Sequence, residues 1–211
     1  PWLFGHFSDN ELPFREKGIV ELYLSHPKDD PNHLAAHKFL QDRKVKKAGW
    51  KEDRDFLELV VDTYYRKVTS ALKKNDPNHL YLGTRLHGRA LQSEQIFVAA
   101  GKYADVISVN YYHRWTPEKE RIENWSALAG KPILITEWYA MAEDSDLPIE
   151  GVGAGFPVRT QADRAKFYQH FSLGLLQLPS CIGWHWFKYR DSRNNAGIVD
   201  KESKPYDVLW K

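Results

Sequence analysis

The stretch Lys131-Pro-Ile-Leu-Ile-Thr-Glu-Trp-Tyr139 is the strongest indication of the fold. Three consecutive aliphatic residues, Ile133 to Ile135, are typical of a short strand that is buried on both faces of a parallel sheet, and Pro132 marks its start. Glu137 comes where the apolar run ends. In a parallel barrel the chemistry takes place at the C-terminal ends of the strands, so Glu137 is a candidate catalytic carboxylate. A strand-end glutamate that only forms an ion pair is the alternative interpretation.

Further short apolar runs alternate with helical patterns along the chain. Strands are expected at residues 2–8, 80–84, 105–109 and 181–187. Helices are expected at residues 19–24, 33–47, 53–74, 91–102, 116–128 and 160–178, with Asn32 as the cap of the second. This order is typical of right-handed βα units. Aromatic and charged residues follow nearly every strand, which favours a (β/α)₈ TIM barrel over a doubly wound sheet.

We expect residues 1–211 to form a single α/β domain that corresponds to the later part of such a barrel. About five strands are visible, whereas a closed barrel has eight. The strands that begin near Leu3 and Cys181 would then be edges that carry apolar side chains. About three more βα units are therefore expected upstream of Pro1, and this upstream half of the barrel is the polypeptide partner that we expect.

The composition excludes several classes of function. The 211 residues include 30 basic and 28 acidic side chains interspersed along the chain, which does not indicate a nucleic-acid partner. No apolar run reaches the roughly 18 residues of a membrane span, so no membrane partner is expected. The single cysteine, Cys181, excludes an internal disulfide. The 8 Trp, 11 Tyr and 10 Phe supply many flat rings that can stack on sugars, although core packing uses most aromatic side chains.

Two glutamates at strand ends match the need of retaining glycosidases for two carboxylates about 5 Å apart. Asp9-Asn10-Glu11 follows the first expected strand, and Ile135-Thr136-Glu137-Trp138 ends the strand described above. Together these segments resemble the clan of (β/α)₈ retaining glycoside hydrolases. In that clan an Asn-Glu pair after the fourth strand supplies the acid/base, and a Glu after the seventh supplies the nucleophile. The resemblance implies these roles for Glu11 and Glu137, with carboxyl carbons about 5 to 5.5 Å apart.

Other strand ends extend the resemblance. Asn110-Tyr111-Tyr112 resembles the segment after the sixth strand, whose tyrosine hydrogen-bonds the nucleophile. Three further segments resemble β-agarases of family 50 and their relatives: Phe7-Ser-Asp-Asn-Glu-Leu12, Tyr81-Leu-Gly-Thr-Arg85 and Gly183-Trp-His-Trp-Phe-Lys-Tyr189. The resemblance therefore implies a hydrolase that cleaves β-linked, galactose-containing polysaccharides or oligosaccharides by double displacement. Such a substrate implies a secreted or periplasmic protein, although no signal peptide is visible.

The expected substrate-binding residues follow the strands. Asn10 would bond the sugar 2-OH, and Tyr112 and Arg85 would donate hydrogen bonds to Glu137. The complete expected set is Asn10, Arg85, His87, Asn110, Tyr112, Trp138, Trp184, Trp186 and Asp191. The three tryptophans include the expected stacking platforms. Trp184 and Trp186 should point the same way and His185 the opposite way, and one of these two faces is packing. No metal and no cofactor are expected.

Residues 141–158 are longer than an ordinary connection between strand and helix. We expect them to form a loop that lines the cleft. Glu143, Asp144 or Asp146 would then contact the substrate.

The alternative from another class is a non-catalytic carbohydrate-binding protein, or an inactive barrel fragment, which would keep the aromatic platforms without needing both glutamates. Among enzymes, specificity like that of a β-galactosidase, β-glucuronidase or β-mannanase is also open.

Two other motifs have simpler explanations than a metal site or a dinucleotide site. His33-Leu-Ala-Ala-His37 lacks the glutamate that a metalloprotease carries beside its first histidine, so solvated histidines are expected. Gly151-Val-Gly-Ala-Gly155 follows no expected strand and does not indicate dinucleotide binding.

Overall fold

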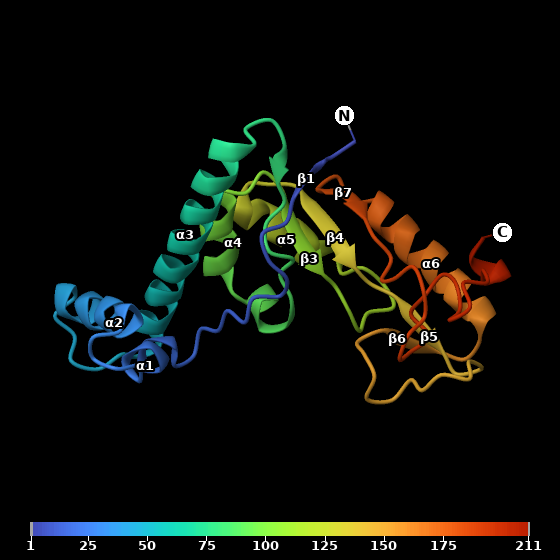
Figure 1. Ribbon diagram of the computed structural model, residues 1–211, viewed down its shortest axis with the longest axis horizontal. Coiled ribbons are helices and arrows are strands. Elements are labelled where there is room, and N and C mark those ends of the chain that lie inside the picture. Colours follow the sequence, from blue (N-terminus) through green and yellow to red (C-terminus); the bar gives the residue numbers. More distant parts are fainter. Residues whose placement is uncertain (1, 211) are drawn as a thin grey trace. The chain divides into compact units, whose positions relative to one another are not determined.

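The computed structural model describes residues 2–210, which form two compact units (Figure 1). Unit 1 comprises Pro1–Ile107 with Leu128–Lys131, and unit 2 comprises Ser108–Ala127 with Pro132–Lys211. That the chain is a single domain stays a prediction. Within the described residues, no helix has both the length and the apolar character that a membrane crossing requires.

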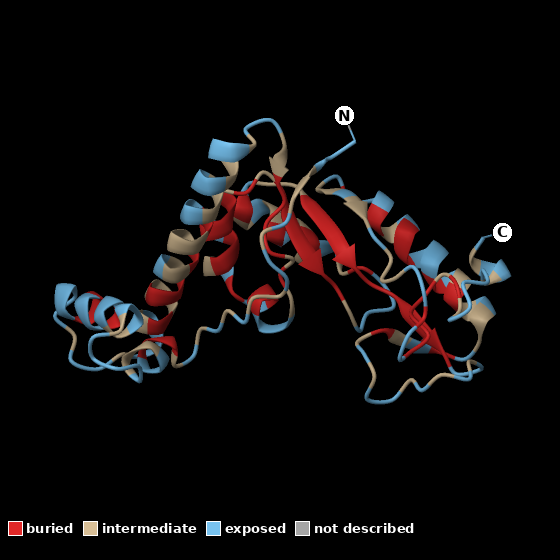
Figure 2. Ribbon diagram, viewed as in Figure 1, coloured by how far each residue is buried: buried red, intermediate tan, exposed pale blue. Residues whose placement is uncertain are grey.

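Unit 1 joins a small parallel sheet to several helices. The strands are β1 (Gly5–His6) and β2 (Leu80–Tyr81), and the helices are α1 (Ile19–Leu24), α2 (Pro31–Asp42), α3 (Trp50–Asn75) and α4 (Glu94–Gly101), with a 3₁₀ turn at Gly88–Gln92. In the sheet Gly5 lies opposite Leu80 and His6 opposite Tyr81. The buried side of α3 packs against α4 (Figure 2). The expected elements are present, but both strands are shorter than predicted.

The boundaries of α2 differ from the prediction at both ends. The expected cap Asn32 is wrong: Asp30 is the cap, and its side chain accepts a hydrogen bond from the Asn32 backbone N–H at 2.7 Å. Pro31 occupies the first helical position, where its missing N–H has no cost. The helix ends at Asp42 and not near residue 47, because Lys44 has a φ of 56°. This left-handed conformation cannot continue a right-handed helix.

Unit 2 is organised around a three-stranded parallel sheet in the order β3-β4-β7. Its strands are β3 (Ile107–Asn110), β4 (Ile133–Glu137) and β7 (Cys181–Trp184), and the helices are α5 (Lys119–Ala129) and α6 (Gln161–Leu176), with a 3₁₀ turn at Asp207–Leu209. Every residue of β3 and β4 is buried (Figure 2), as the apolar runs predict for central strands.

Cys181, which was expected in the core, is half-buried, and burial raises the pKa of its thiol.

The expectation of an unbroken loop at residues 141–158 is wrong. Residues Ala140–Ala142 form β5 and Phe156–Val158 form β6, and the two strands pair in parallel. The reason is long-range: the Asn195 side chain accepts from the Ala142 N–H at 3.2 Å, and Gly155 lies so close to the Tyr139 ring that a Cβ would collide with it. The described residues thus contain three small parallel sheets and no closed barrel.

The residues between β5 and β6 divide by role. Asp144 accepts from the Gln161 N–H at 3.0 and 3.2 Å and therefore caps the start of α6. This contact gives Asp144 a structural role, which the sequence did not indicate. Glu143 and Asp146 are exposed, and their contact with a substrate stays a prediction.

A buried arginine connects three segments of unit 2. The Arg164 side chain in the first turns of α6 is 0% exposed. Its Nε donates to the Ala140 carbonyl at 3.0 Å, and its Nη2 donates to the Gly197 carbonyl at 2.7 Å. Burial lowers the pKa of Arg164 to about 10, while the negative charge of Asp191 opposes this shift. Arg164 therefore stays charged at neutral pH and ties α6 to β5 and to the segment after β7.

We predict that Arg164→Met lowers the free energy of unfolding by about 3–5 kcal/mol, because it leaves two buried carbonyl groups and the nearby buried Asp191 without this partner. Urea denaturation of the 211-residue chain measures the effect. The matched control is Lys166→Met on the same helix, where an exposed ion pair with Asp163 at 3.1 Å is expected to contribute little to stability. Equal losses in both variants would contradict the role given to Arg164.

Candidate active site

Glu137, the last residue of β4, forms the best-defined part of the candidate site. Its side chain is almost fully buried, and Tyr112 Oη donates a hydrogen bond to Oε2 of its carboxylate. The reason is the pairing of neighbouring strands: the Tyr111 N–H donates to the Glu137 carbonyl at 2.8 Å, which aligns the residues after β3 with the end of β4. The expected hydrogen bond between Tyr112 and Glu137 is thus confirmed. A buried carboxylate held by a phenol is placed to act on a ligand at this strand end.

The side chain of Asn110 joins two strands of the sheet in unit 2. Asn110 is 0% exposed, and its Oδ1 accepts from Thr136 Oγ1 at 2.7 Å. Successive residues of a strand point to opposite faces, so Thr136 and Glu137 lie on different sides of β4. The expected contact of Asn110 with substrate stays a prediction.

The three expected tryptophan platforms have different surroundings. Trp138 is 1% exposed and stacks on Phe171 with 4.4 Å between ring centroids. The expectation that Trp138 contacts substrate is therefore wrong, because helix α6 covers the ring. Trp186 donates from Nε1 to the Ala196 carbonyl at 2.7 Å and meets Trp138 edge-on. Trp184 is half-buried and, within residues 2–210, makes no ring contact. Its role as a sugar-stacking platform stays a prediction.

Asp191 organises the segment after β7. It is 4% exposed, and its Oδ1 accepts from the Gly197 N–H at 2.6 Å. Its Oδ2 accepts from Asn195 Nδ2 at 3.0 Å and from Tyr206 Oη at 2.5 Å. Burial and this last bond raise the pKa of Tyr206. Every one of these partners folds the segment back on itself, so Asp191 has a structural role and the expected substrate contact is wrong.

Glu11 in unit 1 lies at the corresponding place after β1. Its backbone N–H donates to the Thr84 carbonyl after β2 at 3.1 Å, and its Oε1 lies 4.0 Å from His87 Nδ1. Glu11 and Arg85 have φ angles of 55° and 54°, which non-glycine residues adopt rarely. Such strain costs about 1–3 kcal/mol per residue and concentrates at functional sites. Two of the expected site residues, Glu11 and His87, therefore lie close together in unit 1.

The remaining expected residues of unit 1 are also placed. Asn10 is exposed, and the Arg85 guanidinium carbon lies 5.5 Å from the centre of the Phe7 ring. Glu11 belongs to unit 1 and Glu137 to unit 2, and their separation stays a prediction.

Hydroxyl groups that the sequence did not indicate support the segment before Glu11. Tyr64 Oη donates to Asp9 at 2.6 Å, and Ser8 Oγ lies 2.8 Å from Tyr81 Oη. Burial raises the pKa of Tyr81 to about 12, so the phenol stays protonated. Because Tyr64 comes from α3, these bonds fasten the chain between β1 and Glu11 to the helix. The only signal in the sequence was the tyrosine content.

A second carboxylate cluster follows β3 but has a structural explanation. Glu118 Oε2 accepts from Tyr111 Oη at 2.5 Å and from Arg114 Nε at 3.0 Å. Burial alone would raise the pKa of Glu118, but these hydrogen bonds and a third from Arg121 hold it at about 2. The Glu118 carboxylate accepts from all three donors, and the spacing Arg114-x₃-Glu118-x₂-Arg121 could have indicated the cluster.

Comparison with known proteins now defines the relatives of the chain. No protein family model matches it. Beta-agarase B of Vibrio sp. (strain JT0107) is 30% identical over 258 aligned positions, which cover 99% of this chain. The crystal structure of BpGH50 is 41% identical over 97% of the chain, with a TM-score of 0.89. The chain is homologous to the family-50 β-agarases.

A further structure, of an exo-β-agarase, is 27% identical over 99% of the chain, with a TM-score of 0.85. The chain spans 26% of the length of beta-agarase B, 47% of BpGH50 and 34% of the exo-β-agarase. The expected resemblance to family-50 β-agarases is therefore confirmed, and the homology covers both units.

We predict that Trp138→Ala in this β-agarase homologue lowers the free energy of unfolding by about 3–5 kcal/mol, because it empties a packed site under α6. The same change at half-buried Trp184 is expected to cost clearly less. Denaturant unfolding of both variants measures the difference. A larger loss from Trp184→Ala would show that the packing roles of these rings are assigned the wrong way round.

Proposed function

We propose that this chain carries the two catalytic carboxylates of a retaining β-agarase, an enzyme that cleaves β-linked, galactose-containing polysaccharides or oligosaccharides. The observation that carries the proposal is Glu137, which is buried at the C-terminal end of β4 and bound by Tyr112. The homology to a protein named Beta-agarase B supports the choice of substrate class.

Glu137 is proposed as the nucleophile. The hydrogen bond from Tyr112 to Oε2 orients the carboxylate that we expect to attack the anomeric carbon. The attack forms a glycosyl ester and releases the leaving oxygen of the next sugar, and water then cleaves the ester. The phenol stabilises the carboxylate again as it leaves in the second step.

Glu11 is proposed as the acid/base. It would give its proton to the leaving glycosidic oxygen and then take a proton from the attacking water. This exchange requires the carboxyl carbons of Glu11 and Glu137 to be about 5 to 5.5 Å apart, within a (β/α)₈ barrel that includes about three further βα units. Two observations support a functional assignment for Glu11. Its backbone conformation is rare, and its carboxylate lies close to the imidazole of His87. Exposed Asn10, beside Glu11, would bond the sugar 2-OH.

Other side chains would complete the subsites. Trp184 would stack on a sugar face, while Arg85 and His87 would bind hydroxyl groups near Glu11. Because agar is an extracellular polymer, the protein would act in a secreted or periplasmic form.

We predict that Glu137→Gln and Glu11→Gln both abolish most release of reducing sugar from agarose in the protein that carries this chain. For Glu11→Gln the loss should be about 10²–10⁴-fold, the usual contribution of general acid–base catalysis. Azide separates the two roles in the alanine variants with an activated aryl glycoside, because the small anion can enter the space of the removed carboxylate and this leaving group departs without protonation. The Glu137→Ala variant should give a glycosyl azide of inverted configuration, and the Glu11→Ala variant one of retained configuration. The opposite pairing would reverse the assignment.

The hydrogen bond itself gives a finer prediction. Tyr112→Phe should lower kcat/KM on agarose by about 10–100-fold, because a hydrogen bond to a charged group contributes about 1.5–3 kcal/mol. Tyr111→Phe is a closely matched control: it removes the neighbouring phenol, whose partner Glu118 has no proposed catalytic role. A similar loss of activity in both variants, or none in Tyr112→Phe, would argue against Glu137 as the nucleophile.

The alternative of a non-catalytic carbohydrate-binding protein rests on the same aromatic side chains. It predicts that the unmodified protein binds agarose but releases no reducing sugar from it or from other β-galactans, β-glucuronides or β-mannans. Turnover that disappears in Glu137→Gln would exclude this alternative. The substrate that is hydrolysed would also decide between agarase specificity and that of a β-galactosidase, β-glucuronidase or β-mannanase.

A further inference from the structure

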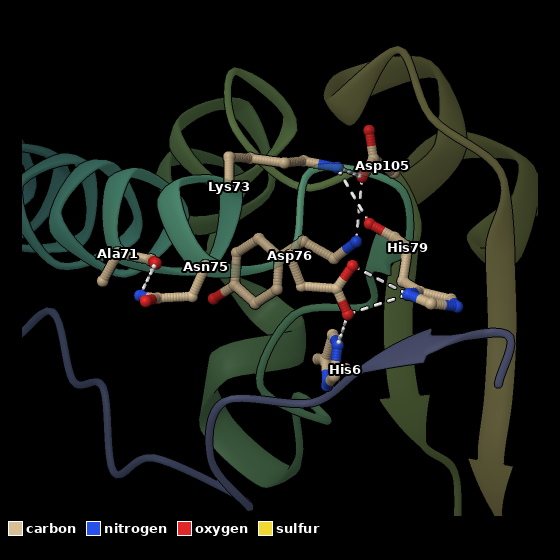
Figure 3. Close-up of polar contacts among 8 residues, drawn as sticks. His6, Ala71, Lys73, Asn75, Asp76, His79 and Asp105 are labelled. Carbon is tan, nitrogen blue, oxygen red and sulfur yellow. Dashed lines mark hydrogen bonds and ion pairs between the residues drawn. The ribbon is translucent and has the colours of Figure 1, made fainter.

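Three side chains in unit 1 converge away from the candidate catalytic residues, near the start of β2. His6 comes from β1, Asp76 follows the last residue of α3, and His79 directly precedes β2. Figure 3 shows both imidazole rings turned toward the Asp76 carboxylate. Glu11 and Arg85 come later, in the segments that follow β1 and β2. The chemistry proposed above gives no role to the three residues of the cluster.

The distances are those of a compact cluster of ligand atoms. His6 Nε2 lies 2.8 Å from Asp76 Oδ2, and His79 Nδ1 lies 2.8 and 2.7 Å from the two Asp76 oxygens. One ligand atom from each residue lies within 4.8 Å of the others. The rings approach each other edge-on with 6.0 Å between centroids. Each side chain is 30–33% exposed, so solvent reaches the cluster.

The residue types match one class of cation. Two imidazole nitrogens and one carboxylate suit zinc and its neighbours in the first transition row, whereas magnesium and calcium prefer oxygen ligands alone. Zinc bonds of about 2.0–2.1 Å place tetrahedral ligand atoms roughly 3.3 Å apart. The hydrogen-bonded atoms would therefore separate by only about half an ångström to admit the ion. Solvent access leaves room for water as a fourth ligand.

We propose that His6, Asp76 and His79 form a structural binding site for a divalent transition-metal ion, with zinc the best fit. The ion would replace the hydrogen bonds between the side chains by three metal bonds. It would join residues 70 positions apart in sequence and fasten β1 to the turn between α3 and β2. The metal-free expectation from the sequence is replaced by this proposal, because only folding brings His6 to Asp76.

The charges around the cluster are compatible with a cation. Lys73 Nζ lies 3.1 Å from Asp105 Oδ2 and donates to the His79 carbonyl at 2.9 Å (Figure 3). Asp105 thus offsets the charge of Lys73, and the bond to the carbonyl fixes the backbone of His79.

The test is titration of the protein that carries this chain, stripped with a chelator, with Zn²⁺ alone in a calorimeter and with Co²⁺ in an absorption spectrometer. We expect a bound ion, a cobalt spectrum with imidazole ligands, and a higher Tm with zinc because the ion binds the folded state.

Three histidine variants make the test specific. His6→Gln and His79→Gln should each weaken zinc binding by at least about 10-fold, since even outer partners of a metal contribute 10–100-fold. His37→Gln is the matched control, because this histidine stacks on His33 in α2, outside the cluster. Circular dichroism of the metal-free variants confirms folding, and if one variant unfolds, the other decides together with the cobalt spectrum of the unmodified chain.

The outcomes are distinct from those for the catalytic glutamates, because metal binding needs no activity. Absence of binding, or binding that both cluster variants retain, would overturn the proposal and leave a plain hydrogen-bonded bridge. Binding lost only in His37→Gln would also overturn it and place the ion on α2. Failure of the agarase proposal would leave all of these readouts unchanged.

Discussion

The parallel pairing of β4 with the two strands beside it is the constraint on which the candidate site of unit 2 depends. The Tyr111 N–H donates to the Glu137 carbonyl at 2.8 Å, and the Phe187 N–H donates to the Trp138 carbonyl at 3.0 Å. Parallel strands end at the same edge of a sheet, so these main-chain bonds bring Tyr112 close to Glu137. Main-chain geometry thus sets the position of the carboxylate, and side chains refine it.

Buried charges hold the segments that leave this edge. Arg164 and Asp191 are both almost fully buried. Arg164 donates a hydrogen bond to the Gly197 carbonyl, and Asp191 accepts one from the Gly197 N–H. Burying a charge is costly unless it is paired and hydrogen-bonded, and both groups satisfy that condition. A loop fixed by such contacts cannot move to another position without exposing an unpaired charge. These contacts fix the backbone next to Ala196, whose carbonyl accepts a hydrogen bond from Trp186 Nε1.

The sequence predicted what local patterns can specify. Helix Ile19–Leu24, strand Ile133–Glu137 and the bond from Tyr112 to Glu137 were all expected, since each follows from an apolar run or from a segment that resembles known enzymes. Residues 156–158 were not recognised as a strand, because their partner Ala140–Ala142 is distant and Asn195 completes the pairing.

The same limit explains the misassigned site residues. Trp138 and Asp191 carry side chains that suit sugar binding, and sequence alone does not show that Phe171 covers one and Tyr206 binds the other. His6 was equally invisible as a neighbour of Asp76, although Asp76 and His79 are close in sequence. Partnerships across 15 to 70 residues depend on the fold, and periodicity carries no information about them.

Units 1 and 2 position their candidate carboxylates by one common method. Glu137 is the last residue of β4, and Glu11 lies in the segment that follows β1. The backbone of each is bonded to the segment after a neighbouring strand: Glu11 to Thr84, and Glu137 to Tyr111. In unit 1 the backbone is additionally held in a left-handed conformation that costs about 1–3 kcal/mol. The bond to Thr84, and the anchoring of Asp9 to Tyr64, stabilise that conformation from both sides of the residue. Backbone strain of this kind lowers stability unless the surrounding contacts maintain it, and here the bonds to Thr84 and Tyr64 supply those contacts.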